Sequence, residues 1–147
     1  MKKVLIQLFM KKLILSLFIL LASALTASVS ARSTVYTGTI GTYKIHMVLD
    51  ENYEGYYYYD HRPQSRFTLV KTHESESEEM PMNLNITLQE YAPGTNKNTG
   101  EFVGEWYWLI EADVALVMFE GTFRNKSTGK TLPFEVSRSY EILECID

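Results

Sequence analysis

The chain has 147 residues, with 14 lysines and arginines against 18 aspartates and glutamates, a net charge of −4 and a single cysteine. These totals exclude a collagen, a disulfide-linked scaffold, a zinc finger built on several cysteines and a wholly disordered polypeptide. They average over two unlike segments, an apolar N-terminus and a tyrosine-rich remainder.

The first 31 residues have the pattern of a secretory signal peptide. Four lysines supply a positive leading region, and an apolar run from Leu13 to Leu25 follows them. Val29-Ser30-Ala31 then fits the small-x-small pattern that a signal peptidase accepts. We therefore expect residues 1–31 to direct export, and residues 32–147 to form a single mature domain that is periplasmic or secreted.

The apolar run is short for a membrane anchor, although a retained N-terminal anchor is the alternative interpretation. A stable span of the bilayer core needs roughly 20 apolar residues, and no later run reaches that length. No cysteine lies close behind the run to carry the lipid of a bacterial lipoprotein. Cys145 has no second cysteine to pair with inside the chain, so we expect it to be a small apolar residue or to pair with another chain.

Charge limits the classes of partner. Residues 1–31 hold four of the 14 basic residues and none of the acids, so the remainder carries ten bases against 18 acids, a net charge of −8. So acidic a protein repels nucleic acid and anionic lipid. We therefore expect no nucleic-acid partner.

Beyond residue 33, apolar and polar residues alternate with the period of a half-buried β-strand. Ile45, Met47 and Leu49, for example, share one face, and Lys44 and His46 share the other. The alternation predicts about eight strands, and no segment has a convincing helical period. The predicted strands are 36–40, 43–49, 55–59, 66–69, 83–89, 102–108, 115–123 and 132–137. Short turns between them favour an antiparallel meander.

A repeated aromatic-x-Gly-x-apolar pattern indicates how the sheet closes. All three positions lie on one face of a strand, so each glycine interrupts a bulky inward stripe. Such a glycine suits a strand that coils sharply or leaves room for a neighbour's large side chain. We therefore predict a small all-β barrel, with a two-sheet β-sandwich as the alternative. The four glycines are Gly38, Gly55, Gly104 and Gly121.

Several of these segments also carry a resemblance to known proteins. Tyr36–Leu49, Gly55–Asp60, Thr99–Gly104 and Gly129–Val136 resemble a group of small exported bacterial proteins common in the Bacteroides lineage. That group has no assigned activity, and the shared motifs are structural. More loosely, the meander of Gly-x-aromatic strands looks like the avidin and lipocalin architecture. The lipocalin Gly-x-Trp near the first strand is missing, so the resemblance implies no ligand inside the barrel.

The run of four tyrosines is the strongest candidate for a binding surface. On a strand, Tyr57 and Tyr59 point to one side and Tyr56 and Tyr58 to the other. We expect the inward pair to fill the core. The outward pair would give an aromatic surface suited to a sugar ring, a peptide or another subunit. Equally, tyrosine is simply a good strand residue.

Trp106 and Trp108 share a face, and they suggest a second possible site. With Tyr57 and Tyr59 they could line the pocket of a carrier for a small apolar molecule. Packing is the more common role of such residues, because eight strands enclose barely enough room for side chains.

Chemistry beyond binding has little support in the sequence. The polar stretch from His73 to Met82 could gather calcium or copper, but its spacing matches no metal loop and charge runs are usually solvated. His46 and His61 would matter only if one met an acid inside a cleft. The acids at Glu90, Glu101, Glu105 and Glu111 are expected to keep the surface wet. We expect no cofactor and no metal.

The sequence therefore predicts an exported, non-catalytic module that binds a peptide, glycan or protein of the cell envelope through Tyr56 and Tyr58. Alternatives are the small-ligand carrier, a hydrolase or a metal-binding protein. Self-association is a further option.

Overall fold

The computed structural model describes residues 2–8, 10, 32–111 and 114–141, and for residues 111 and 139–141 only the backbone is described. The chain divides into two compact units, residues 1–31 and 32–147. Residues 2–8 and 10 are helical. Within the described residues, every helix is too short or too polar to cross a membrane.

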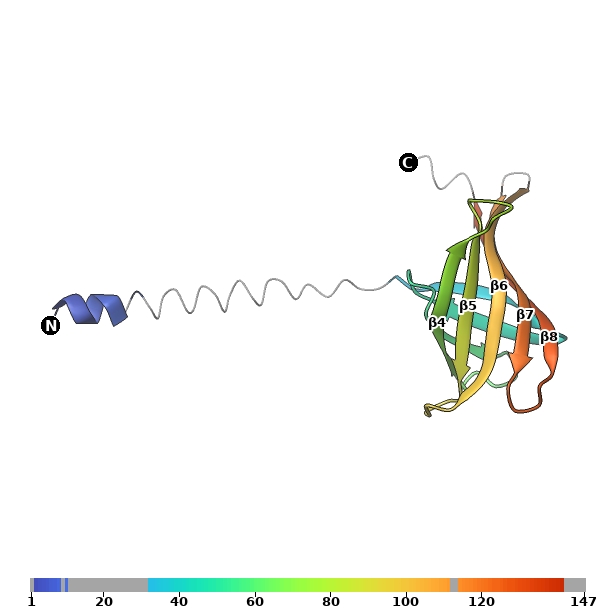
Figure 1. Ribbon diagram of the computed structural model, residues 1–147, viewed down its shortest axis with the longest axis horizontal. Coiled ribbons are helices and arrows are strands. Elements are labelled where there is room, and N and C mark those ends of the chain that lie inside the picture. The colour runs from blue at the N-terminus through green and yellow to red at the C-terminus, as the bar shows by residue number, and fades with distance from the viewer. Residues whose placement is uncertain (1, 9, 11–31, 112–113, 142–147) are drawn as a thin grey trace. The chain divides into compact units, whose positions relative to one another are not determined.

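The second unit is a closed barrel of eight antiparallel strands, as the sequence predicts (Figure 1). Each strand pairs with the next along the chain, and β1 also pairs with β8 through Thr37–Ile40 and Phe134–Ser137. The meander barrel is thereby confirmed over the sandwich. The strands are β1 Thr34–Ile40, β2 Tyr43–Leu49, β3 Gly55–Tyr59, β4 Phe67–Glu76, β5 Leu84–Tyr91, β6 Asn98–Glu111, β7 Val114–Asn125 and β8 Thr131–Glu141.

Alternation of side chains fills the barrel with apolar groups. Positions two apart along each strand point inward, so that Ile45, Met47 and Leu49 of β2 are all buried. Large aromatic rings complete the core, among them Phe102 and Phe134, whose centroids are 5.0 Å apart. The interior is therefore occupied by side chains along most of its length.

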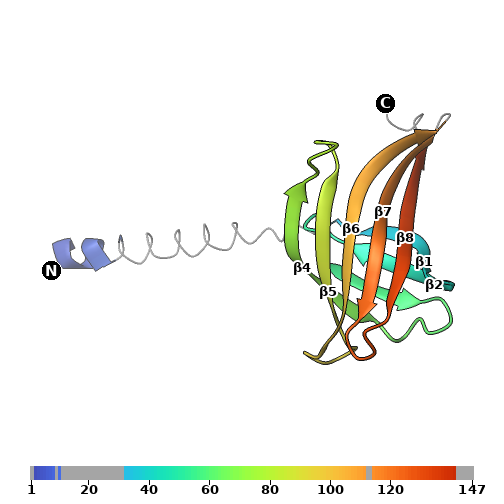
Figure 2. The same cartoon turned by 45° about the vertical axis from the view of Figure 1, so that its right-hand side comes forward.

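Strand lengths are uneven. The strands β4, β6 and β8 are markedly longer than the alternation of apolar residues predicts. β6 has 14 residues and pairs with β7 from Gly100 to Glu111, whereas β3 has five. Figure 2 shows β6, β7 and β8 curving together beside β1 and β2. Pairing between β3 and β4 covers only Phe67–Leu69 of β4. The polar stretch from His73 to Met82 begins inside β4, which continues to Glu76.

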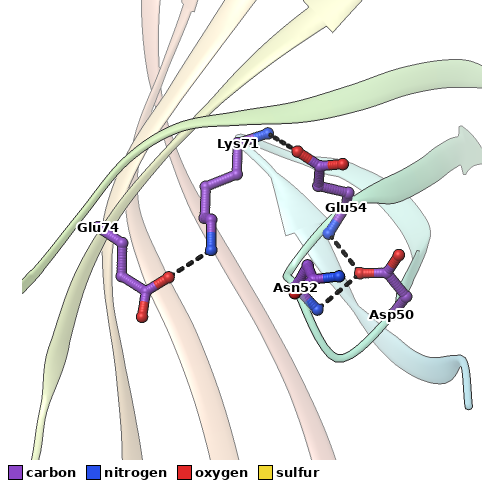
Figure 3. A network of polar contacts seen from close by, with 5 residues as sticks. All are labelled: Asp50, Asn52, Glu54, Lys71 and Glu74. Atoms are coloured by element: carbon purple, nitrogen blue, oxygen red, sulfur yellow. Dashed lines mark hydrogen bonds and ion pairs between the residues drawn. The ribbon is translucent and has the colours of Figure 1, made fainter. Parts of the chain in front are cut away.

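A polar network joins the β2–β3 turn to the part of β4 that extends past β3 (Figure 3). One carboxylate oxygen of Asp50 accepts hydrogen bonds from the backbone N–H of Asn52 at 2.8 Å and of Glu54 at 3.0 Å. Glu54 in turn accepts from the backbone N–H of Lys71 at 3.2 Å, and the Lys71 ammonium pairs with Glu74. The side chain of Glu54 therefore takes the place of a neighbouring strand for one N–H of β4.

Glycines of the repeated pattern allow adjacent backbones to approach closely. A Cβ on Gly38 would overlap the carbonyl oxygen of Glu135 in β8, and one on Gly121 would overlap that of Val103 in β6. The close approach occurs where β1 meets β8 and where β6 meets β7, as expected for strands that coil to close a barrel.

Replacing Gly121 tests this role. We expect Gly121→Ala to lower the free energy of unfolding by about 1–3 kcal/mol, because the methyl group displaces the backbone of β6. Thr122→Ala, at the adjacent exposed position, is the matched control and should change it by less than about 0.5 kcal/mol. Urea denaturation of both variants measures the difference. Equal stabilities would show that the contact with β6 does not require glycine.

Candidate functional site

The four tyrosines of β3 divide between the two faces of the sheet as alternation predicts. Tyr57 is fully buried in the core, and Tyr59 is partly buried against it. Tyr56 and Tyr58 lie on the outer surface, where both are half-buried. One strand thus supplies side chains to two separate environments.

The outward pair belongs to a row of stacked groups that extends across β2 and β3 to Arg66, the residue before β4. The rings of Tyr56 and Tyr58 are stacked with centroids 6.5 Å apart, and the His46 ring stacks on Tyr58 at 5.0 Å with an interplanar angle of 15°. The Arg66 guanidinium lies 4.6 Å from the centre of the Tyr56 ring, a cation–π contact. We call Arg66, Tyr56, Tyr58 and His46 the outer aromatic face.

A shallow groove adjoins this face. It has a volume of about 400 Å³, and its lining includes Lys44, His46 and Asp60. His46 Nε2 and Asp60 Oδ1 are 2.9 Å apart, and this hydrogen bond lowers the pKa of the Asp60 carboxyl below its ordinary value. The carboxylate in turn holds the imidazole in one orientation.

The His46–Asp60 pair fulfils the condition set by the sequence, that a histidine meet an acid in a cleft. Nucleophilic catalysis by a side chain would further need a hydroxyl or thiol hydrogen-bonded to the ring. Among the described residues, the hydrogen-bond partner of His46 is Asp60, and no hydroxyl or thiol takes part. The contacts of His46 with Asp60 and with the Tyr58 ring orient the imidazole within the outer aromatic face.

The outer face of β6, β7 and β8 is negatively charged. Glu105, Glu120 and Glu135 occupy directly paired positions on the three strands. Burial and then Glu120 raise the pKa of the neighbouring Tyr107 to about 12. In the part of the chain that the structure describes, no three His, Cys, Asp or Glu side chains are placed to hold a metal ion.

Inside the barrel lies the buried carboxylate of Glu90, which the sequence places among the surface acids. Glu90 is only 2% exposed, so that expectation is wrong for this residue. The Tyr57 hydroxyl donates a hydrogen bond to Glu90, and Thr99 Oγ1 donates another at 2.6 Å. Burial raises the pKa of Glu90, and these two hydrogen bonds partly oppose the rise.

Periodicity alone could have located Glu90. It continues the inward series of Leu84, Ile86 and Leu88 on β5, at a spacing of two. Its partners could not be found in that way, because Tyr57 comes from β3 and Thr99 from β6. The contacts depend on the way in which the strands wrap around the barrel.

Tyr59 packs against Tyr57, the partner of Glu90, and also lines a pocket at one end of the barrel. The pocket, which we call the mouth pocket, has a volume of about 430 Å³. Its lining residues come from the start of β2, the end of β3, the β3–β4 loop, the start of β4 and the β5–β6 loop. They are Tyr43, Tyr59, His61, Arg62, Ser65, Phe67 and Pro93.

Trp106 and Trp108 lie at the opposite end of the barrel. Trp106 is paired with Leu84, the first residue of β5. Glu90, which accepts the hydrogen bond of Tyr57, is the second-last residue of the same strand. The Trp106 ring packs edge-on against Tyr53 at 5.8 Å. Its Nε1 is buried without a hydrogen-bond acceptor in the described part of the chain. The tryptophans and the inward tyrosines therefore do not line one cavity, because the core lies between them.

The remaining residues that the sequence suggested as possible site residues lie apart from one another or outside the described part of the chain. Trp108 is 52% exposed and lines an apolar hollow of about 340 Å³ with Met80 and Met82. His73 hydrogen-bonds Ser75 at 3.2 Å within β4. Cys145 lies outside the described residues.

These features define the protein as a small antiparallel β-barrel with a solid core, an outer aromatic face and a pocket at one end. Comparison with protein-family models, with curated protein sequences and with solved structures gave no match.

The buried carboxylate gives a testable dependence of stability on pH. The raised pKa means that folded Glu90 holds its proton more tightly than unfolded Glu90 does. Stability should therefore fall as pH rises from the ordinary value of 4.5 through the raised value. We expect Glu90→Gln to remove this part of the fall, as measured by urea denaturation between pH 4 and pH 8. An unchanged slope would contradict the burial of an ionisable Glu90.

Tyr57 supplies a second test of the same group. Tyr57→Phe removes a donor to Glu90, so we expect a loss of about 1–3 kcal/mol in the free energy of unfolding. The loss should be larger at pH 8 than at pH 5, because a hydrogen bond to an ionised carboxylate contributes more to stability than one to the neutral acid. Tyr43→Phe removes a hydroxyl from an exposed ring and should be nearly neutral. Equal effects of the two substitutions would contradict the prediction.

Proposed function

We propose that the protein is an exported, non-catalytic binding module that contacts a peptide, glycan or protein of the cell envelope through its outer aromatic face. The observation that carries the proposal is the continuous row of Arg66, Tyr56, Tyr58 and His46 on the surface of the barrel. Exposed aromatic and arginine side chains are the groups most enriched in binding interfaces.

The row supplies two kinds of contact at once. Half-buried tyrosines offer apolar area and a hydroxyl at little cost in side-chain entropy. Arg66 and the groove residue Lys44 add positive charge on a chain that is acidic as a whole. The complementary partner therefore has rings or apolar groups beside acidic ones.

The fixed geometry of the row favours binding without large rearrangement. His46 is held by both Asp60 and the Tyr58 ring, and Arg66 is held over Tyr56. Side chains that are ordered before binding lose little freedom when a partner arrives.

The cellular setting of the proposal rests on the N-terminal sequence. The lysines and apolar run of residues 1–31 match an export signal, and the mature part resembles small exported bacterial proteins. We therefore propose a periplasmic or secreted location. A second copy of the chain is one partner of suitable charge, because its paired glutamates on β6 to β8 complement the outer aromatic face.

The double substitution Tyr56→Ser and Tyr58→Ser tests the proposal. Affinity for the partner should fall at least tenfold, since each buried interface tyrosine commonly contributes more than about 1 kcal/mol. The measurement is crosslinking and capture from envelope extracts of the host, followed by titration of the captured partner. Sedimentation of the protein alone measures self-association.

Tyr107→Ser is the matched control. It removes an outward tyrosine from β6, in the acidic surface, and should leave capture of a different envelope partner unchanged. If the partner is a second copy of the chain, Tyr107→Ser should weaken self-association, because Tyr107 lies among the paired glutamates. Circular dichroism should show that all variants remain folded, because the substituted rings lie outside the core. An unchanged capture profile for the double variant would refute the proposed surface.

A further inference from the structure

We propose that the mouth pocket is a second, separate binding site, and that it takes a small organic anion made of one ring system and a carboxylate. Arg62 would hold the carboxylate, and Tyr43, Tyr59 and Phe67 would pack against the ring. This site differs in location and in ligand from the outer aromatic face.

The walls of the pocket are aromatic rings set at steep angles to one another. Tyr59 lies 6.1 Å from Tyr43 with an interplanar angle of 82°, and 6.1 Å from Phe67 at 89°. His61 is tilted against Tyr59 at 5.7 Å. A flat or puckered ring that enters between them meets both faces and edges, the two arrangements that aromatic contacts favour.

Positive charge lies at the rim, and the lining contains no acidic residue. Among the described residues, the Arg62 guanidinium has no carboxylate partner in any ion pair or hydrogen bond. An arginine left free beside aromatic walls, on a chain with more acids than bases, is suited to a carboxylate that comes from outside.

The floor of the pocket limits the size of the ligand. Tyr57 lies beneath the walls, stacked on Phe67 at 5.1 Å and edge-on to Tyr59 at 5.6 Å. Glu90 lies below it and is absent from the pocket lining, and its carboxylate oxygens already accept hydrogen bonds from Tyr57 and Thr99. A cavity of about 430 Å³ above this floor is large enough for one or two fused rings.

Hydrogen-bonded turns hold the pocket open in advance. In the β3–β4 loop, the backbone N–H of Arg62 donates to Tyr59 O at 2.8 Å, and that of Ser65 donates to Arg62 O at 3.1 Å. In the β5–β6 loop beside Pro93, Thr95 donates to the carbonyl of Ala92 from both its N–H and its hydroxyl. A pre-formed pocket requires little ordering when it binds.

Titration of the purified protein with defined probes tests the site. The probes are indole-3-acetate, its neutral analogue indole-3-acetamide, and glucuronate, which carries the carboxylate on a sugar ring. We expect saturable binding of at least one anion with a dissociation constant below about 1 mM, and about tenfold weaker binding of the amide. Calorimetry measures the affinity of each probe, and changes in the NMR shifts of the tyrosine rings show where the probe binds. Preference for indole-3-acetate or for glucuronate shows whether the ligand carries an aromatic ring or a sugar ring.

Two substitutions inside the pocket and one control outside it relate the binding to the pocket. Arg62→Gln should weaken the anion about tenfold and leave the amide unchanged. Arg124→Gln, which removes an exposed arginine of β7 outside the pocket, should change neither. Tyr43→Ser, at an exposed ring of the wall, should weaken both acid and amide.

Three results would overturn the proposal: no saturable binding of either anion at 10 mM probe, a level about tenfold above the expected constant; equal affinity for acid and amide; or equal effects of Arg62→Gln and Arg124→Gln. Because these titrations involve neither Tyr56 nor Tyr58, their failure would leave the proposed function standing. Loss of partner capture at the outer aromatic face would likewise leave the mouth pocket unaffected.

Discussion

The close contact between β1 and β8 is the constraint on which the rest of the structure depends. Only a residue without a side chain fits at Gly38, because a Cβ there would overlap the backbone of Glu135. Gly121 has the same role between β7 and β6. Closure separates an inner from an outer surface on every strand, and it thereby sends neighbouring tyrosines of β3 into the core and onto the outer aromatic face.

Burial of Glu90 shows how this barrel combines a solid core with a polar group. A carboxylate in an apolar interior is costly unless donors surround it, and Tyr57 and Thr99 provide them from two other strands. The hydrogen bond fixes Tyr57, which in turn supports Tyr59 and Phe67 above it. A polar interaction in the core thus positions the aromatic walls at the end of the barrel.

Local sequence patterns predict the strands better than they predict the sites. Alternation specified the eight strands and the opposite orientations of Tyr56 and Tyr57, because both follow from a period of two along one segment. It could not show that Arg66 stacks on Tyr56, or that Arg62 and Pro93 line one pocket, because those contacts join separate loops and strands. Alternation does not predict the end of β4 or the start of β6, because pairing with neighbouring strands extends both into polar residues.

The unequal lengths of β3 and β4 have a consequence for the behaviour of the protein in a crowded compartment. Past Leu69, β4 is paired on one side with β5 and borders no part of β3. A bare strand margin is a template on which other chains can assemble into fibrils. Here it carries Lys71, His73, Glu74 and Glu76, and Glu54 covers one of its N–H groups. Charged side chains along such a margin oppose pairing with a further strand, because their charges would have to leave water. The polar stretch from His73 therefore begins as part of a solvated strand margin.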